Sequence, residues 1–108
     1  MEFPENEIVE IKKFIDLLNS EEDGVVIVEG KRDSAALVKL GYSGKILEFH
    51  RFNGMIKFAD SAAKYHKIIL LLDGDRKGRY LTKKIIELLE HRTKIDLFFK
   101  KKIGRAHV

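Results

Sequence analysis

The chain has 108 residues, a common length for a single domain, and 44% of them are hydrophobic, which is enough to form one core. It contains no cysteine, which excludes disulfides, thiolate zinc sites and cysteine nucleophiles. No apolar run approaches the ~20 residues that span a bilayer, and the acidic N-terminus is unlike a signal peptide. We therefore expect a cytoplasmic protein that does not act at a membrane.

Charge is distributed unevenly along the chain. Residues 1–24 carry eight acids and two bases, a net charge of −6, whereas residues 25–108 carry nine acids and nineteen bases, a net charge of +10. A basic surface attracts polyanions, so nucleic acid is a candidate partner. A lysine-rich, cysteine-free composition is also typical of heat-adapted proteins, so charge alone does not identify the partner.

The predicted elements begin with an amphipathic helix over residues 4–19, where apolar residues recur every three or four positions. Runs of apolar residues with little alternation predict buried strands at 25–28, 68–72 and 95–99, and a weaker strand is predicted at 45–49. Helices are predicted between the strands: one over about 33–40 with Asp33 or Ser34 as its cap and Gly41 as its stop, one after 53–54, and one from about 76.

Strands separated by helices of this length pair in parallel through right-handed crossovers. The expected fold is therefore an α/β, three-layer α/β/α sandwich with a mainly parallel, Rossmann-like sheet of about four strands. Residues 1–108 are expected to form a single domain, with the first helix in 1–23, the core in 24–100 and a tail in 101–108.

Three carboxylates directly follow predicted strands. Glu29 comes after the apolar run 25–28, and Asp73 and Asp75 come after 68–72. Because ligands bind open parallel sheets beyond the carboxyl ends of the strands, these acids are expected to share one edge. There they would repel each other without a cation, and Mg²⁺ prefers carboxylate oxygens. Each aspartate alone is better explained as a turn former or helix cap, but the three acids together predict a magnesium site.

Other motifs in the sequence are incomplete. The segment 73–84 begins like a calcium loop, but Lys77 and Lys84 stand where oxygen ligands are required. The segment 25–32 lacks the first glycine and the final serine or threonine of a P-loop. In an aspartyl-phosphate phosphatase the Asp-x-Asp pair is expected on the first strand, which here ends in a glutamate. The histidines have no metal-ligand spacing and are predicted to be surface or packing residues: His50, His66, His91 and His107.

Three segments in this order resemble the Toprim family, which includes topoisomerases, bacterial-type primases, OLD-family nucleases and the ribonuclease that matures 5S ribosomal RNA. The matching positions are Glu29, Gly30 and Asp33 after the first strand, Asn53 and Gly54 in a short turn, and Asp73, Asp75 and Gly78 after the third strand. The resemblance covers residues 24–100, and it is nearest in kind to small maturase-like and OLD-type nucleases.

The resemblance implies that Asp73 and Asp75 bind Mg²⁺, with Mn²⁺ as a substitute, and that Glu29 is a general acid or base or an additional metal ligand. Basic residues beside these acids are expected to bind phosphate: Lys31, Arg32, Arg76, Lys77 and Arg79. The turn and cap positions expected to support the site are Gly30, Asp33, Asn53, Gly54 and Gly78.

The sequence leaves two functions open. One is a small Mg²⁺-dependent nuclease that acts in RNA processing or DNA repair; the other is a non-catalytic RNA- or DNA-binding module of a larger processing complex. No tyrosine-bearing cleavage domain, zinc ribbon or polymerase region is recognised, so we expect neither a topoisomerase nor a complete primase. The shortness of the chain favours a homo-oligomer or partner proteins that help to hold the substrate.

Overall fold

The structure, a computed structural model, describes residues 5–72 and 74–97. The helices within these residues are α1 (Glu5–Asn19), α2 (Lys31–Lys39), α3 (Met55–Ala62) and α4 (Arg76–Leu89), with a 3-10 turn, η1, at Phe49–Arg51. The strands are β1 (Gly24–Val28), β2 (Lys45–Glu48), β3 (Lys67–Leu70) and β4 (Lys94–Asp96). In this part of the chain no helix has the length and apolar character needed to cross a membrane.

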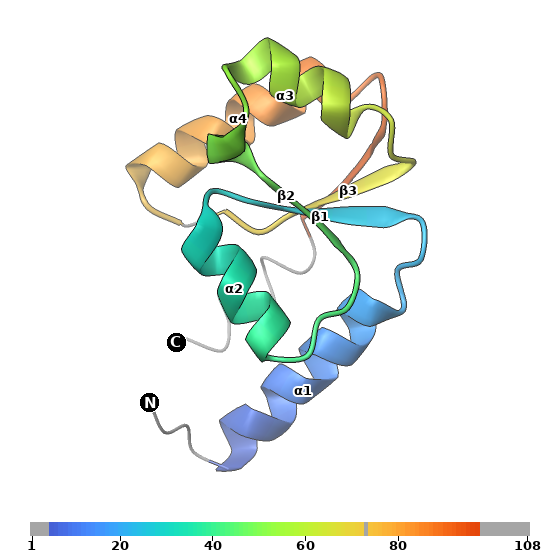
Figure 1. The fold of residues 1–108 in the computed structure, drawn as a ribbon, viewed down its shortest axis with the longest axis vertical. Helices are drawn as coiled ribbons and strands as arrows, with labels where there is room; N and C mark the ends of the chain where they lie inside the picture. The colour runs from blue at the N-terminus through green and yellow to red at the C-terminus, as the bar shows by residue number, and fades with distance from the viewer. Residues whose placement is uncertain (1–4, 73, 98–108) are drawn as a thin grey trace.

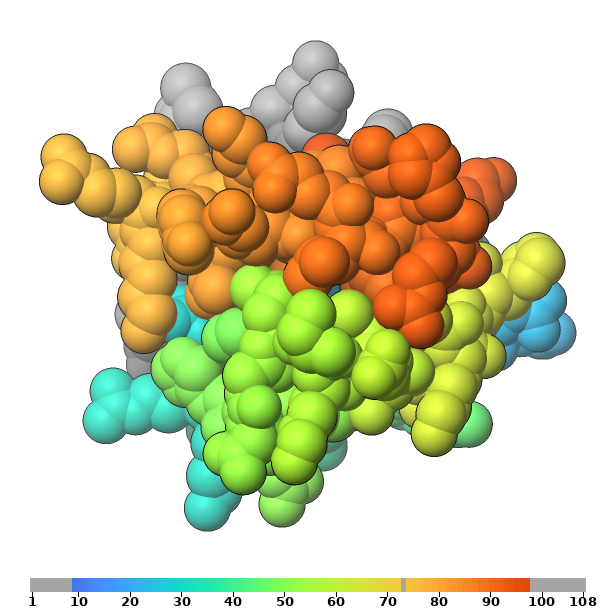
Figure 2. Space-filling model, turned by 90° about the horizontal axis from the view of Figure 1, so that it is seen from above, coloured from blue at the N-terminus to red at the C-terminus, as the bar shows by residue number. Residues whose placement is uncertain are grey.

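The strands form one sheet in the order β2-β1-β3-β4, and every neighbouring pair is parallel. Helices α1 and α2 cover one face of this sheet, while α3 and α4 lie side by side on the other (Figures 1 and 2). The predicted three-layer sandwich with about four parallel strands is therefore confirmed. The central strand β1 is buried along its whole length, as its uninterrupted apolar sequence predicts.

Side chains of β1 alternate between two separate hydrophobic clusters. Val25 and Ile27 pack with the side chains of α3 and α4, including the fully buried Phe58. Val26 and Val28 pack on the opposite face with those of α1 and α2, including Leu18. Successive side chains of a strand point to opposite faces, so the sequence of β1 serves both layers at once.

Several element boundaries differ from those predicted. Strand β3 ends at Leu70 rather than at residue 72, and β2 ends at Glu48 because the chain then turns into η1. Strand β4 covers Lys94–Asp96, and positions 98 and 99 of the predicted strand lie outside the described residues. Helix α2 begins at Lys31, two residues earlier than predicted. Gly41, the predicted stop, has φ of 107°, a left-handed conformation that glycine adopts readily.

Candidate metal and nucleic-acid site

The order of the strands creates a topological switch point between β1 and β3. Helix α2 leads from β1 to the outer strand β2 across one face, and α3 leads back from β2 to β3 across the other face. Between β1 and β3 the connections therefore change from one face of the sheet to the other. Ligands of open parallel sheets bind beyond the carboxyl ends of the strands at such a switch point. Glu29 follows β1, and the segment that contains Asp73 and Asp75 follows β3.

Backbone hydrogen bonds tie together the segments that leave these strands. The amide of Leu71 donates to the carbonyl of Ile27 across 2.9 Å, which prolongs the pairing of β1 with the segment after β3. The amide of His50, in η1, donates to the carbonyl of Glu29 across 3.0 Å. The residues that follow β1, β2 and β3 therefore meet at one edge.

The Glu29 carboxylate faces the beginning of α4. Its Oε1 lies 3.1 Å from Nζ of Lys77 and 3.4 Å from Nε2 of His50. The Glu29 side chain is only 14% exposed, whereas that of Lys77 is 65% exposed. Side chains alternate between the two faces along β1, and this alternation explains where the Glu29 side chain points. Glu29 continues the series of Val25 and Ile27, which faces α3 and α4. The Glu29 carboxylate and the segment after β3 are therefore neighbours.

Asp75 caps helix α4. Its Oδ1 accepts a hydrogen bond of 2.7 Å from the amide of Gly78, one of the amides at a helix start that lack a partner within the helix. The side chain therefore has the capping role that an aspartate in this position often has. Gly78 was expected to let the loop turn, but it is a buried residue inside α4, because this cap starts the helix at Arg76.

The five predicted phosphate-binding residues are all exposed and all lie in the first turns of two helices. Lys31 and Arg32 begin α2, and Arg76, Lys77 and Arg79 begin α4. Both helices start just beyond carboxyl ends of strands, so both N-termini are directed to this edge. Each N-terminus adds a partial positive charge of about +0.5, which favours bound anions.

The structure describes two of the three acids that are predicted to bind a cation, Glu29 and Asp75. Asp73 lies outside the described residues. Within the described residues, no three acids or histidines lie close enough together to hold a metal ion. Glu29 nevertheless already holds a cationic group, the Lys77 ammonium, at 3.1 Å. Asp75 has a second carboxylate oxygen besides the one in the cap. This donor set of carboxylate oxygens is the kind that Mg²⁺ prefers.

The supporting positions are partly as predicted. Gly30 is the N-cap residue of α2 without a side-chain cap, so the expectation that Asp33 caps this helix is wrong; Asp33 lies within its first turn, because the helix starts before it. Gly54 is the N-cap residue of α3 with φ of 100°, and the exposed Asn53 directly precedes it.

His50 is a residue of this site that was predicted only as surface or packing. Its Nε2 faces Glu29, and a Cβ added to Gly30 would lie 3.4 Å from its Nδ1. The available signal was its position after β2, because strands adjacent in a parallel sheet end at the same edge.

Residues 24–108 match the family model described as "Toprim domain". The chain belongs to the Toprim family. It is 41% identical to a UPF0292 protein of Thermococcus sibiricus over 80% of this chain and 68% of that protein. It is 38% identical to a UPF0292 protein of Pyrococcus furiosus over 88% and 70% of the two chains. A solved structure of a putative protein from Aquifex aeolicus superposes with a TM-score of 0.72 at 27% identity, covering 88% of this chain and 89% of that one.

Toprim membership supports a metal-dependent function connected with nucleic acid. The matched region begins at β1 and includes every strand that builds the candidate site. The names of these two relatives state no reaction. The reaction therefore has to be argued from the site itself.

Proposed function

We propose that this Toprim protein is an Mg²⁺-dependent nuclease that cleaves phosphodiester bonds of nucleic acid at the carboxyl edge of its sheet. The observation that carries the proposal is the position of Glu29, a mostly buried carboxylate that faces the start of α4 and holds a cationic group at 3.1 Å. A carboxylate with so little exposure requires a positively charged or hydrogen-bonding partner. The exposed and flexible Lys77 is a partner that a metal ion can replace.

The register of the sheet supports Asp73 as a second carboxylate of this site. Ile27 is paired with Leu70, and continuing the same register by two residues brings Glu29 level with Leu72. Neighbouring strands are about 4.8 Å apart, so the backbone that leads directly into Asp73 runs beside Glu29. Asp75 follows two residues later with one carboxylate oxygen in the cap of α4. We assign Glu29, Asp73 and Asp75 as the Mg²⁺ ligands.

Each group of residues at the site has its own role in cleavage. When bound, Mg²⁺ neutralises phosphate charge and activates a water molecule. The Glu29 carboxylate accepts a proton from the attacking group, because its side chain is only 14% exposed and it faces the start of α4, where the phosphates would be held. Lys31 and Arg32 on α2, and Arg76 and Arg79 on α4, hold the backbone phosphates on either side of the switch point between β1 and β3.

Lys77 has two roles in this proposal. Without metal it neutralises Glu29, which prevents a buried carboxylate from remaining without a partner. With metal and substrate present, its ammonium moves to a phosphate oxygen. Breaking the Lys77–Glu29 ion pair costs little free energy, because an ion pair with an exposed lysine contributes only about 0.2–1 kcal/mol.

The proposal is tested by incubating labelled RNA and DNA with the protein and Mg²⁺. Wild-type protein is expected to cleave at least one of them, and cleavage is expected to stop with a chelator. Glu29→Ala is expected to lower the rate by roughly 10²–10⁴-fold, the contribution of a positioned acid or base, and Asp73→Ala is expected to abolish detectable cleavage because it removes a metal ligand. Glu10→Ala, which removes an exposed carboxylate from α1, is the matched control and is expected to retain the wild-type rate. Cleavage that survives both site substitutions would refute the assignment.

A non-catalytic nucleic-acid-binding module is the second candidate. This candidate is favoured because both site acids that the structure describes already have a partner within the protein. Glu29 pairs with Lys77, and Asp75 caps α4. In that case the basic helix starts bind nucleic acid with strong salt dependence but without turnover. Metal-dependent cleavage by wild-type protein, absent from Glu29→Ala, would exclude this candidate as the complete function.

A further inference from the structure

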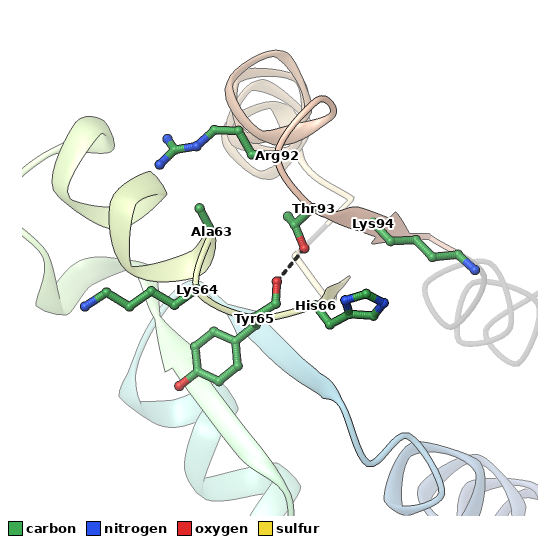
Figure 3. A pocket seen from close by; sticks show the side chains of 7 residues that line it. All are labelled: Ala63, Lys64, Tyr65, His66, Arg92, Thr93 and Lys94. Carbon is green, nitrogen blue, oxygen red and sulfur yellow. Dashed lines mark hydrogen bonds between the residues drawn. The ribbon is translucent and has the colours of Figure 1, made fainter.

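A basic pocket lies at the opposite edge of the sheet from Glu29. It has a volume of about 370 Å³ and lies where the chain enters β3 and β4. Its lining includes the side chains of Lys64, Tyr65, His66, Arg92, Thr93 and Lys94 (Figure 3). None of the roles proposed above uses these residues.

The backbone around this pocket is fixed by the sheet. The Thr93 hydroxyl donates a hydrogen bond of 2.7 Å to the carbonyl of Tyr65, and the amide of Lys94 donates to the carbonyl of His66 across 3.3 Å. These two bonds join the segment before β3 to the segment before β4, and Figure 3 shows the first of them. The positions from which the basic side chains extend are therefore held in place before any ligand arrives.

The charge balance of the pocket favours an anion. Lys64, Arg92 and Lys94 supply three positive charges, and Lys45 adds a fourth nearby, with its Nζ 5.5 Å from the centre of the Tyr65 ring. Against them stand Asp60, whose carboxylate lies 3.3 Å from Arg92, and the C-terminal ends of α3 and α4, each worth about half a negative charge. The balance remains positive.

Lys67, at the start of β3, makes no contribution to anion binding. Its Nζ lies 3.0 Å from a carboxylate oxygen of Glu21 and 3.2 Å from one of Asp96. An incoming phosphate would be repelled by these two acids. The anion-binding capacity is therefore confined to the basic residues that line the pocket itself.

The arrangement of the cations fits a chain of phosphates better than a single small anion. In Figure 3, Lys64 and Arg92 extend to one side of the pocket, and Lys94 extends to the other. A compact anion requires donors that converge on one point, whereas a nucleic-acid backbone presents successive phosphates. We propose that this pocket binds phosphates of the same nucleic-acid strand that is held at the Glu29 edge, an inference that rests on the proposed function.

The two edges set a minimum length for a strand that contacts both. Gly24 is level with Lys67 at the amino edge, and Glu29 is five residues farther along β1. At about 3.3 Å per residue the two edges are about 16 Å apart. A stacked strand advances about 3.4 Å per nucleotide step, so contact with both sites requires about five steps, which is a strand of at least about six nucleotides. A twelve-nucleotide strand satisfies this requirement.

The test compares binding of a labelled twelve-nucleotide single strand, in chelator, by three proteins. Lys64→Gln with Lys94→Gln removes one exposed cation from each side of the pocket; Lys12→Gln with Lys13→Gln removes two exposed cations from α1 and is the matched control. The pocket variant is expected to bind roughly tenfold more weakly, with a log-log salt slope shallower by about 1.4, because each phosphate contact with a single strand contributes about 0.7. The control is expected to match wild type.

Asp60→Asn provides a test in the opposite direction. It removes the carboxylate that partly neutralises Arg92, so binding is expected to be tighter than in wild type. Equal affinities and slopes for the pocket variant and the control would overturn the pocket inference and leave the proposed function standing. Wild-type protein that binds no nucleic acid would overturn both.

The nature of the anion is tested by following the backbone amide signals of Thr93 and Lys94 by NMR. The twelve-nucleotide strand is expected to shift them at micromolar concentration, and inorganic phosphate or a mononucleotide only at concentrations at least 100-fold higher. Shifts produced by either small anion at the same concentration as the strand would overturn the assignment to a nucleic-acid backbone.

Discussion

Asp75 offers a way to separate helix capping from metal binding, because two substitutions affect the two roles differently. Asp75→Ala removes the oxygen that accepts the 2.7 Å hydrogen bond from the Gly78 amide, and it also removes the charge. Asp75→Asn keeps a side-chain oxygen in the same place and removes only the charge. Asparagine is as good an N-cap residue as aspartate, so it retains most of the cap.

The expected losses of stability follow from the cap. Replacing an N-cap aspartate by alanine costs about 1 kcal/mol, which corresponds to a fall of about 4–5 °C in Tm for a domain of this size. The asparagine variant loses only the interaction of the charge with the helix dipole, about 0.3–1 kcal/mol. Without metal, the free energy of unfolding is therefore expected to decrease in the order wild type, Asp75→Asn, Asp75→Ala.

Adding Mg²⁺ tests the second role of the same side chain. At a Mg²⁺ concentration ten times the Kd, binding to the folded state stabilises wild-type protein by RT ln 11, about 1.4 kcal/mol. Both variants are expected to lose this increment, although only the alanine variant loses the cap. The assay is thermal unfolding at several Mg²⁺ concentrations. An Asp75→Asn variant that keeps the wild-type increment would refute metal binding and leave Asp75 as a cap alone.

Three further predictions concern other charges and the core. Lys77→Met removes the cation that competes for Glu29, so calorimetry is expected to show Mg²⁺ binding about 1.4- to 5-fold tighter; unchanged or weaker binding would contradict the competition. Phe58→Ala empties a fully buried site packed between two other phenylalanine rings. It is expected to lower the free energy of unfolding, measured in urea, by about 3–5 kcal/mol, and a loss below about 1 kcal/mol would be inconsistent with this packing. The hydrogen bond to Glu21 raises the pKa of Lys67 above 10.5, so the stability that Lys67 contributes is complete below that pH and is lost as pH rises through the raised pKa. The stability difference between wild type and Lys67→Met is therefore expected to stay constant up to about pH 10 and to shrink as pH rises further, and a difference that stays constant up to about pH 12 would count against the ion pairs.

The layers of the fold follow directly from the sequence, whereas the ends of its elements do not. The uninterrupted apolar residues of β1 identify a strand buried on both faces, and the apolar face of α4 identifies its packing side. The end of β3 could not be placed, because Leu71 and Leu72 are as apolar as the strand before them. Leu72 packs in the hydrophobic cluster on the α3 and α4 face of the sheet, and Leu71 packs against the cluster on the α1 and α2 face, so both are apolar although the strand has ended.

The candidate site shows the same division. A glutamate directly after a buried strand predicted a carboxylate at the sheet edge, and Glu29 lies there. Its partners were not predictable in detail, because Lys77 and His50 reach it from segments that only the sheet order brings together. The cap of α2 was misassigned, because Gly30 begins that helix without the side-chain hydrogen bond that marks such positions in a sequence. Sequence alone also gave no indication of the basic pocket at the amino edge, since its residues come from two separate turns.

The most direct test of the shared cation is a crystal structure after soaking with Mn²⁺, located by its anomalous scattering. A peak is expected beyond the carboxyl ends of β1 and β3, about 2.0–2.2 Å from carboxylate oxygens of Glu29 and of the segment 73–75, with Lys77 moved away from Glu29. A structure at millimolar Mn²⁺ with no peak there and the Lys77–Glu29 pair intact would contradict the account.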